Sequence, residues 1–132
     1  WDGLTFNTQN EVTQINWNQL TLTGSITLQW LPPTVTSLRC RYSGFRGTLN
    51  LTCLPDSIEV SANLLTGDLL LEQLPPKIQE FFVSHAYLSG TLNITQLPES
   101  LEKLGVEGNS FTGTVCLTQL PSYLKGLFLE GN

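Results

Sequence analysis

The sequence predicts an all-β solenoid, in which short strands from successive turns of the chain stack into parallel sheets. One pattern recurs along the chain, and its clearest copy, at 97–119, reads L-P-x-x-L-x-x-L-x-V-x-x-N-x-F-x-G-x-V-x-L. Each copy contains two stretches in which apolar and polar residues alternate, which is typical of half-buried strands. No stretch has the length or the apolar spacing of an α-helix. We therefore expect an arc with a concave parallel sheet, a second and looser run of strands, and little or no helix.

The pattern divides the chain into consecutive copies. Most begin with Leu-Pro, where proline fixes the backbone φ angle and can start a tight turn. The first copy lacks Leu-Pro and has Leu20 in place of an asparagine, as expected of an atypical repeat at the end of a stack. Residues 4–6 alternate like a short strand, and we interpret them as the tail of an earlier coil. The expected domain is 1–132, part of a longer array, with repeats at 8–30, 31–53, 54–73, 74–96 and 97–119 and a partial repeat at 120–132.

Apolar residues at fixed positions define the expected core. In the first alternating stretch of each copy, such as 103–107, the apolar residues should point inward and the others outward. The second stretch, such as 113–117, also alternates and should form the looser strands. Five inward residues of the first strands should lie along one axis, namely Leu38, Ile58, Phe81, Leu104 and Leu127.

Asparagine and glycine also recur at fixed positions. Asn63, Asn109 and Asn132 follow the first strand, where a side-chain amide can bond the backbone of its own coil and of the next coil. Ser43 can replace the asparagine in part. Glycine recurs later in every full copy and predicts a backbone angle closed to residues with a Cβ. These glycines are Gly24, Gly47, Gly67, Gly90 and Gly113.

The composition excludes several classes of function. The net charge is −5 and the pI about 4.6, so the chain lacks the basic surface that nucleic-acid binding requires. No apolar run approaches the roughly 20 residues that span a bilayer. The 3 cysteines have neither zinc-site spacing nor the even number of a disulfide framework, and Cys40 falls on a core position. No cysteine or carboxylate pair accompanies His85, the only histidine, so we expect no catalytic residue, metal or cofactor.

These features resemble the leucine-rich repeat superfamily over nearly the whole chain. The middle of the pattern is similar to L-x-x-L-x-L-x-x-N-x-L. The segments N-L-L-T-G at 63–67 and N-S-F-T-G at 109–113 are similar to the N-x-L-x-G of plant receptor ectodomains. The plant pattern continues G-x-I-P, whereas this one continues G-T-[LV]-x-[LI]-T-x-L-P, which more closely resembles surface leucine-rich proteins of protists such as trypanosomatids. The resemblance implies an extracellular recognition or adhesion role without catalysis, and no particular ligand.

The outward residues of the first strands form the expected binding face. Arg39 and Arg41 flank the inward Cys40 and so project from one side, and arginine and aromatic side chains are enriched at binding hot spots. The alternative is a solvated face with scattered aromatic residues, although exposed apolar patches often mark contacts. The outward set also includes Ser61, Ser84, Glu107 and Glu130. The expected ligand-binding residues are Arg39, Arg41, Tyr42, Glu59, Phe82, His85, Tyr87 and Phe128.

Two N-glycosylation sequons occupy the same repeat position. Asn50 and Asn93 each begin an Asn-x-Thr tripeptide, and both lie between inward apolar residues. Both asparagines should therefore point outward on the second strand run. The alternative is an asparagine that merely suits an exposed strand position, and glycosylation itself requires a secretory route.

We predict a non-catalytic module, secreted or displayed at the cell surface, that presents its concave face to a protein or glycan ligand. The competing hypothesis is a structural subunit of an extracellular coat, sheath or filament. Stacked coils have open ends, and unpaired strand edges allow end-to-end self-association. An intracellular scaffold is a third hypothesis.

Overall fold

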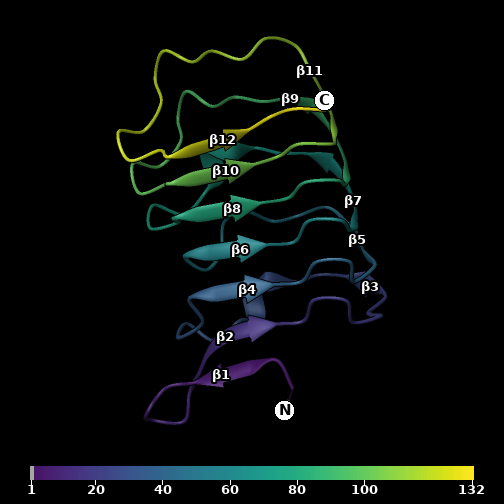
Figure 1. The fold of residues 1–132 in the computed structure, drawn as a ribbon, viewed down its shortest axis with the longest axis vertical. Helices are drawn as coiled ribbons and strands as arrows, with labels where there is room; N and C mark the ends of the chain where they lie inside the picture. Colours follow the sequence, from purple (N-terminus) through teal and green to yellow (C-terminus); the bar gives the residue numbers. More distant parts are fainter. Residues whose placement is uncertain (1) are drawn as a thin grey trace.

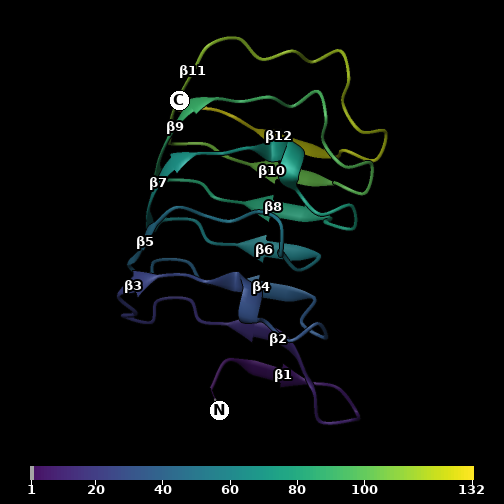
Figure 2. The ribbon, with the colours of Figure 1, turned by 180° about the vertical axis from the view of Figure 1, so that it is seen from behind.

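The chain forms a solenoid with two sheets, and its described residues contain no α-helix. The computed structural model describes residues 2–132, and Trp1 lies outside them. The first sheet has 7 strands in the order β1-β2-β4-β6-β8-β10-β12, and the second has 5 in the order β11-β9-β7-β5-β3. Figure 1 shows the coils stacked one above another from the N-terminus upward, and Figure 2 shows the stack from behind. The predicted fold class is confirmed.

All of the elements are short. The first sheet contains β1 (Leu4–Phe6), β2 (Val12–Asn16), β4 (Ser37–Arg39), β6 (Ser57–Glu59), β8 (Glu80–Phe82), β10 (Lys103–Gly105) and β12 (Gly126–Phe128). The second sheet contains β3 (Gly24–Ser25), β5 (Phe45–Gly47), β7 (Leu64–Asp68), β9 (Tyr87–Thr91) and β11 (Ser110–Thr112). Two single turns of 3₁₀ helix complete the described elements, η1 (Leu28–Trp30) and η2 (Leu71–Gln73).

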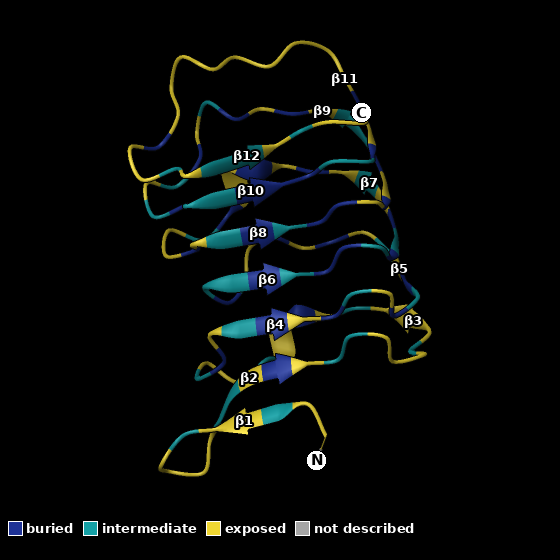
Figure 3. Ribbon diagram, in the orientation of Figure 1, coloured by how far each residue is buried: buried dark blue, intermediate teal, exposed yellow. Residues whose placement is uncertain are grey.

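Apolar side chains from successive coils fill one shared core. Parallel pairing sets Leu38 beside Ile58, Ile58 beside Phe81, Phe81 beside Leu104, and Leu104 beside Leu127. The first four are buried, and Leu127, in the last strand of the sheet, is half-buried. Figure 3 shows a dark blue band, which marks buried residues, in each of the strands β4, β6, β8 and β10. The predicted axis of core side chains is confirmed, since each inward residue packs between those of the coils on either side.

The strand β1 runs against the direction of the other strands. It pairs antiparallel with β2, and Leu4 lies opposite Ile15. Asn7 closes the turn between the two strands, because its side-chain oxygen accepts a hydrogen bond of 2.9 Å from the backbone N–H of Glu11. The tail of an earlier coil would run parallel to β2, so that interpretation of residues 4–6 is wrong. The segment instead forms a hairpin that covers the first edge of the sheet.

Four of the five strands of the second sheet begin earlier than the sequence predicts. For example, β5 ends at Gly47 instead of beginning there, whereas β3 begins at Gly24 as predicted. All five recurrent glycines have positive φ, such as 87° at Gly47, which confirms a conformation that residues with a Cβ rarely adopt. The residues after Gly47 lie outside any strand. They still alternate, with Leu49 and Leu51 buried and Asn50 exposed.

The Leu-Pro steps form the predicted tight turns. The carbonyl of Pro32 accepts a hydrogen bond of 2.9 Å from the N–H of Val35, and the carbonyl of Pro98 accepts one of 3.0 Å from the N–H of Leu101. These turns bring the chain from the second sheet back to the start of the next strand of the first sheet.

The copy at 97–119 leaves apolar side chains uncovered. Val115 and Leu117 occupy inward positions of the repeat, yet they are 39% and 59% exposed. The strand that follows this copy in the described residues, β12, belongs to the first sheet, so no further strand of the second sheet packs against these side chains there.

Asparagine side chains tie each coil to the coil before it. The side-chain nitrogen of Asn109 donates to the carbonyl of Val106 in its own coil (2.9 Å) and to that of Val83 in the preceding coil (3.0 Å). Its oxygen accepts from the N–H of Leu88, also in the preceding coil (3.2 Å). Asn63 makes the equivalent bridge. The prediction that these asparagines bond the next coil is wrong. The backbone groups within their reach belong to the preceding coil, where its first strand has ended.

The substitution Asn109→Ala tests this bridge. It leaves buried backbone groups without partners, so we expect a loss of about 1–3 kcal/mol in the free energy of unfolding for each group left unpaired. Urea denaturation measures the loss. Gln96→Ala removes an exposed side-chain amide that makes no hydrogen bond within the described residues, so it is the control and should leave the midpoint unchanged. If the Asn109→Ala variant and the native chain had the same denaturation midpoint, the asparagine bridge would not contribute to stability.

Candidate functional site

The outer face of the first sheet brings together four of the predicted binding residues. In-register pairing sets Arg39 beside Glu59 and Glu59 beside Phe82. Gly105 lies between Phe82 and Phe128. Because neighbouring residues of a strand face opposite sides, this row points away from the core that Leu38 and its equivalents fill. We call Arg39, Glu59, Phe82, Gly105 and Phe128 the central row.

Two more predicted residues adjoin the N-terminal half of the central row. The guanidinium of Arg41 lies 5.5 Å from the centre of the Tyr42 ring, a cation–π contact. Its Nε lies 3.2 Å from Oε1 of Glu59, so this arginine is already paired within the protein. Tyr42 is 58% exposed. Arg39 is exposed and makes no ion pair within residues 2–132.

Tyr42 and His85 share a backbone conformation that is costly for their type. Both have left-handed φ angles, 55° at Tyr42 and 52° at His85. The equivalent residue of every other coil is also left-handed, and these residues are Gln19 (61°), Ala62 (55°), Gly108 (65°) and Gly131 (72°). The turn after the first strand of each coil requires this angle. A residue with a Cβ that adopts it costs about 1–2 kcal/mol of conformational free energy. The glycines before Asn109 and Asn132 were the signal in the sequence that could have revealed this position.

Three outward positions differ from the prediction. Tyr87 lies at the start of β9, so it belongs to the second sheet instead of the first, because the chain has already turned at His85. Ser61 and Ser84 are only 5% and 3% exposed. Their side chains are short enough for the neighbouring coils to cover, and Oγ of Ser61 accepts a hydrogen bond of 3.1 Å from the N–H of Ser84.

Ion pairs across neighbouring coils neutralise part of the face. Lys103 Nζ lies 2.8 Å from Oε1 of Glu80, and Lys125 Nζ lies 2.7 Å from Oε2 of Glu102. The hydrogen bond from Lys103 lowers the pKa of Glu80, and the same bond raises the pKa of Lys103. Within residues 2–132, Glu107 and Glu130 make no such pair. The C-terminal half of the face therefore carries unpaired negative charge.

The two sequons have the same local geometry. Asn50 and Asn93 are exposed, as predicted, although neither lies in a strand. The side-chain oxygen of Asn50 accepts hydrogen bonds from the N–H of Thr52 (2.9 Å) and from its hydroxyl (2.8 Å). Asn93 and Thr95 repeat this turn, with distances of 3.1 and 2.7 Å.

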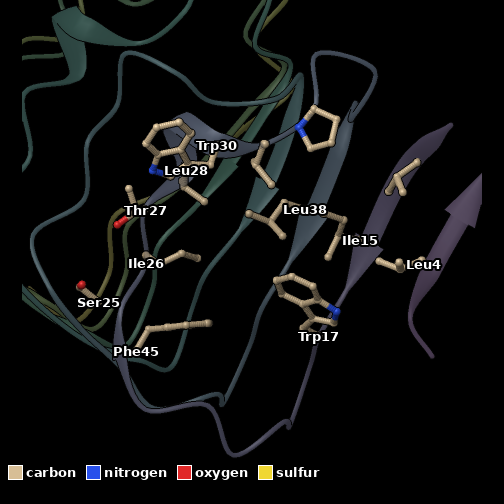
Figure 4. Close-up of a pocket in the computed structure, with 13 residues that line it drawn as sticks. Leu4, Ile15, Trp17, Ser25, Ile26, Thr27, Leu28, Trp30, Leu38 and Phe45 are labelled. Carbon is tan, nitrogen blue, oxygen red and sulfur yellow. The ribbon is translucent and has the colours of Figure 1, made fainter. Parts of the chain in front are cut away.

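An apolar cavity of about 440 Å³ lies at the N-terminal end of the core, away from the predicted residues. Figure 4 shows Ile15, Trp17, Ile26 and Leu38 turned toward this space. Few polar groups line it. It is the uncovered end of the shared core, since β1 extends only the first sheet.

The described residues offer no metal site and no membrane-spanning helix. No group of His, Cys, Asp and Glu side chains in 2–132 is arranged to hold a metal ion. No helix in that range is long and apolar enough to cross a bilayer.

The fold and the repeat define a leucine-rich-repeat solenoid, and solved structures of that class resemble it. The chain matches a pollen receptor kinase 3 at 24% identity and a TM-score of 0.74, with coverage of 100% of this chain and 79% of that one. It matches the leucine-rich-repeat ectodomain of the receptor kinase SOBIR1 from Arabidopsis thaliana at 21% identity and a TM-score of 0.80, covering 100% and 82%. It also matches a chain of the BIR3–SERK2 complex from Arabidopsis thaliana at 20% identity and a TM-score of 0.73, covering 99% and 74%.

These likenesses establish the fold. No family model and no curated protein matches the sequence. The expected likeness to protist surface proteins finds no support in the three structures.

The cysteines differ in their expected reactivity. Burial raises the pKa of the Cys40 thiol to about 12. The exposed Cys116 has its sulfur 3.0 Å from the hydroxyl of Thr118, and that hydrogen bond lowers its pKa. More of Cys116 is therefore thiolate at neutral pH, and thiolate is the form that reacts.

We expect iodoacetamide to label Cys116 in the native protein while Cys40 stays unlabelled, as measured by site-resolved mass spectrometry. Thr118→Val should slow labelling of Cys116, because it removes the bond that lowers the pKa. The exposed Cys53 is the internal control and should keep its rate. Equal rates at Cys116 before and after the substitution would contradict the assignment.

Proposed function

We propose that this protein is a non-catalytic recognition module, secreted or displayed at the cell surface, that binds a protein partner on the outer face of its first sheet. A solenoid suits this role because its coils present a broad and rigid surface. One of the similar structures is itself a complex, between BIR3 and SERK2. A glycan is the alternative ligand, since exposed aromatic rings also stack on sugars.

The observation that carries the proposal is the presence of large side chains, Tyr42 and His85, at a turn whose left-handed angle every coil shares. At the same turn, two other coils have glycine, which adopts this angle without strain. A bulky aromatic residue and a histidine therefore stand where glycine would be more stable. Strained residues that persist on an exposed face are typical of binding sites.

The location is supported by the two sequons. Asn50 and Asn93 lie at equivalent exposed turns, and each Thr hydroxyl already bonds its asparagine. Both positions lie away from the central row, on the segments that follow the second sheet. Glycans there would leave the proposed binding face open.

The double substitution Tyr42→Gly with His85→Gly tests the binding face. We expect the free energy of unfolding to rise, by about 1 kcal/mol for each site, because the strain is relieved. Binding of the fluorescently labelled protein to intact cells of its source, measured by flow cytometry, should fall. Ala62→Gly is the matched control: it relieves the same strain and should leave binding unchanged. Undiminished binding by the double variant would exclude the face.

The competing structural role predicts a different outcome. A subunit of a coat or filament should form concentration-dependent polymers in sedimentation velocity, whereas a recognition module should stay monodisperse. Polymers that also form in the Tyr42 and His85 variant would favour end-to-end association over recognition.

Glycosylation has its own test. When the chain is expressed through a eukaryotic secretory pathway, a glycosidase specific for N-linked glycans should lower its mass. Asn50→Gln and Asn93→Gln should each remove one glycan, because the sequon asparagine is the attachment site. No change of mass in the secreted native chain would contradict the assignment.

A further inference from the structure

Two phenylalanines meet over a glycine on the C-terminal half of the outer face. Phe82 and Phe128 belong to strands that are not neighbours, because β10 lies between β8 and β12. Their rings nevertheless lean together, with centroids 6.3 Å apart and planes tilted by 35°. Gly105 lies beneath them and is buried. We call Phe82, Phe128, Gly105 and Gly126 the aromatic shelf.

Both glycines of the aromatic shelf make room for the rings. A Cβ on Gly105 would collide with Cδ1 of Phe82 and come within 2.9 Å of its Cε1. A Cβ on Gly126 would lie 2.9 Å from Cε2 of Phe128. Neither glycine has a left-handed φ, so backbone conformation does not explain why glycine is needed there. The lack of space for a Cβ beside the rings does explain it. Glycine weakens a strand, and within strands it often marks a close approach.

Uncompensated negative charge borders the aromatic shelf. Oε2 of Glu107 would lie 3.2 Å from that same Cβ position on Gly105, so the carboxylate adjoins the Phe82 ring. This oxygen is buried and has no hydrogen-bond partner within the described residues, and the same holds for Oγ of Ser84. Glu130 follows β12, two residues after Phe128, and is exposed. The nearby Lys103 is already paired with Glu80.

We propose that the aromatic shelf and Glu107 hold an arginine side chain from a basic segment of a protein partner. The inference rests on the proposed function and names the chemistry of the ligand. A guanidinium is planar, stacks on aromatic rings and pairs with carboxylates, so one group satisfies both features of the site. The cation compensates a carboxylate that the protein itself leaves unpaired. The net charge of −5 adds attraction for a basic segment at longer range.

A neutral sugar fits these features less well. It would stack on the two rings, but it brings no charge for Glu107. A lysine supplies the charge as a compact ammonium that has no plane to lie against a ring. The paired rings and the unpaired carboxylate together therefore favour arginine over a neutral sugar and over lysine.

The probes are short Gly/Ser peptides carrying two arginines, and matched peptides with citrulline, the neutral isostere of arginine. Fluorescence anisotropy measures binding to the native chain. We expect the citrulline peptide to bind about tenfold more weakly. Added salt should weaken only the arginine peptide. Phe82→Leu and Glu107→Gln should each weaken the arginine peptide several-fold.

Two control variants make the same chemical changes elsewhere. Phe6→Leu removes an exposed ring on β1, and Glu72→Gln removes an exposed carboxylate on η2. Both should bind the arginine peptide as the native chain does. Circular dichroism on each variant shows whether it is folded, so a loss of binding by misfolding is recognised.

Equal binding of the arginine and citrulline peptides would overturn the proposal, as would an unchanged affinity in Phe82→Leu and Glu107→Gln. Binding of neutral glycans on an array, lost in Phe82→Leu, would assign the aromatic shelf to sugars and also overturn it. If the peptides fail while cell binding still depends on Tyr42 and His85, only the aromatic shelf assignment falls. If cell binding is also independent of Tyr42 and His85, the proposed function falls with it.

Discussion

Strand pairing in this solenoid joins each coil only to the coils on either side of it. A single coil is too short to form a sheet by itself, and its polar backbone groups need partners once they are buried. Parallel strands supply part of that pairing. The asparagine bridges add to it, since Asn63 and Asn109 donate hydrogen bonds to carbonyl groups at the end of the preceding coil's strand. The shared apolar core can form only while this register holds.

The same requirement decides where side chains are available for contact. The turn that leaves each first strand needs a left-handed residue directly before the bridging position. The same left-handed φ angle occurs at this turn in all six coils, and the residues that adopt it range from glycine to tyrosine. The strain at Tyr42 and His85 is tolerated because the strands on either side hold the turn in place. The free energy lost to strain at these two exposed positions is small compared with the stabilisation that the continuous core provides.

The chemistry of the outer face changes along the stack. The N-terminal half carries Arg39 and the paired Arg41, whereas the C-terminal half carries phenylalanines and the unpaired Glu107 and Glu130. Ion pairs between neighbouring coils, such as Glu80 with Lys103, cancel much of the remaining charge. A chain with only 13% charged residues therefore still presents two ends of opposite character. A partner that spans the face would be oriented by that difference.

The sequence by itself determined the coil, its inward residues and the row from Arg39 to Phe128, because alternation and repeat spacing are properties of one strand at a time. The recurrent glycines likewise predicted a positive φ angle, because that angle depends only on local backbone geometry. Only the tertiary structure decided the antiparallel direction of β1, the burial of Ser61 and Ser84, and the coil to which Asn109 reaches. It also decided that two rings from separate strands close over Gly105. Each of these depends on contacts between different strands or different coils, and the pattern within a single strand does not contain that information.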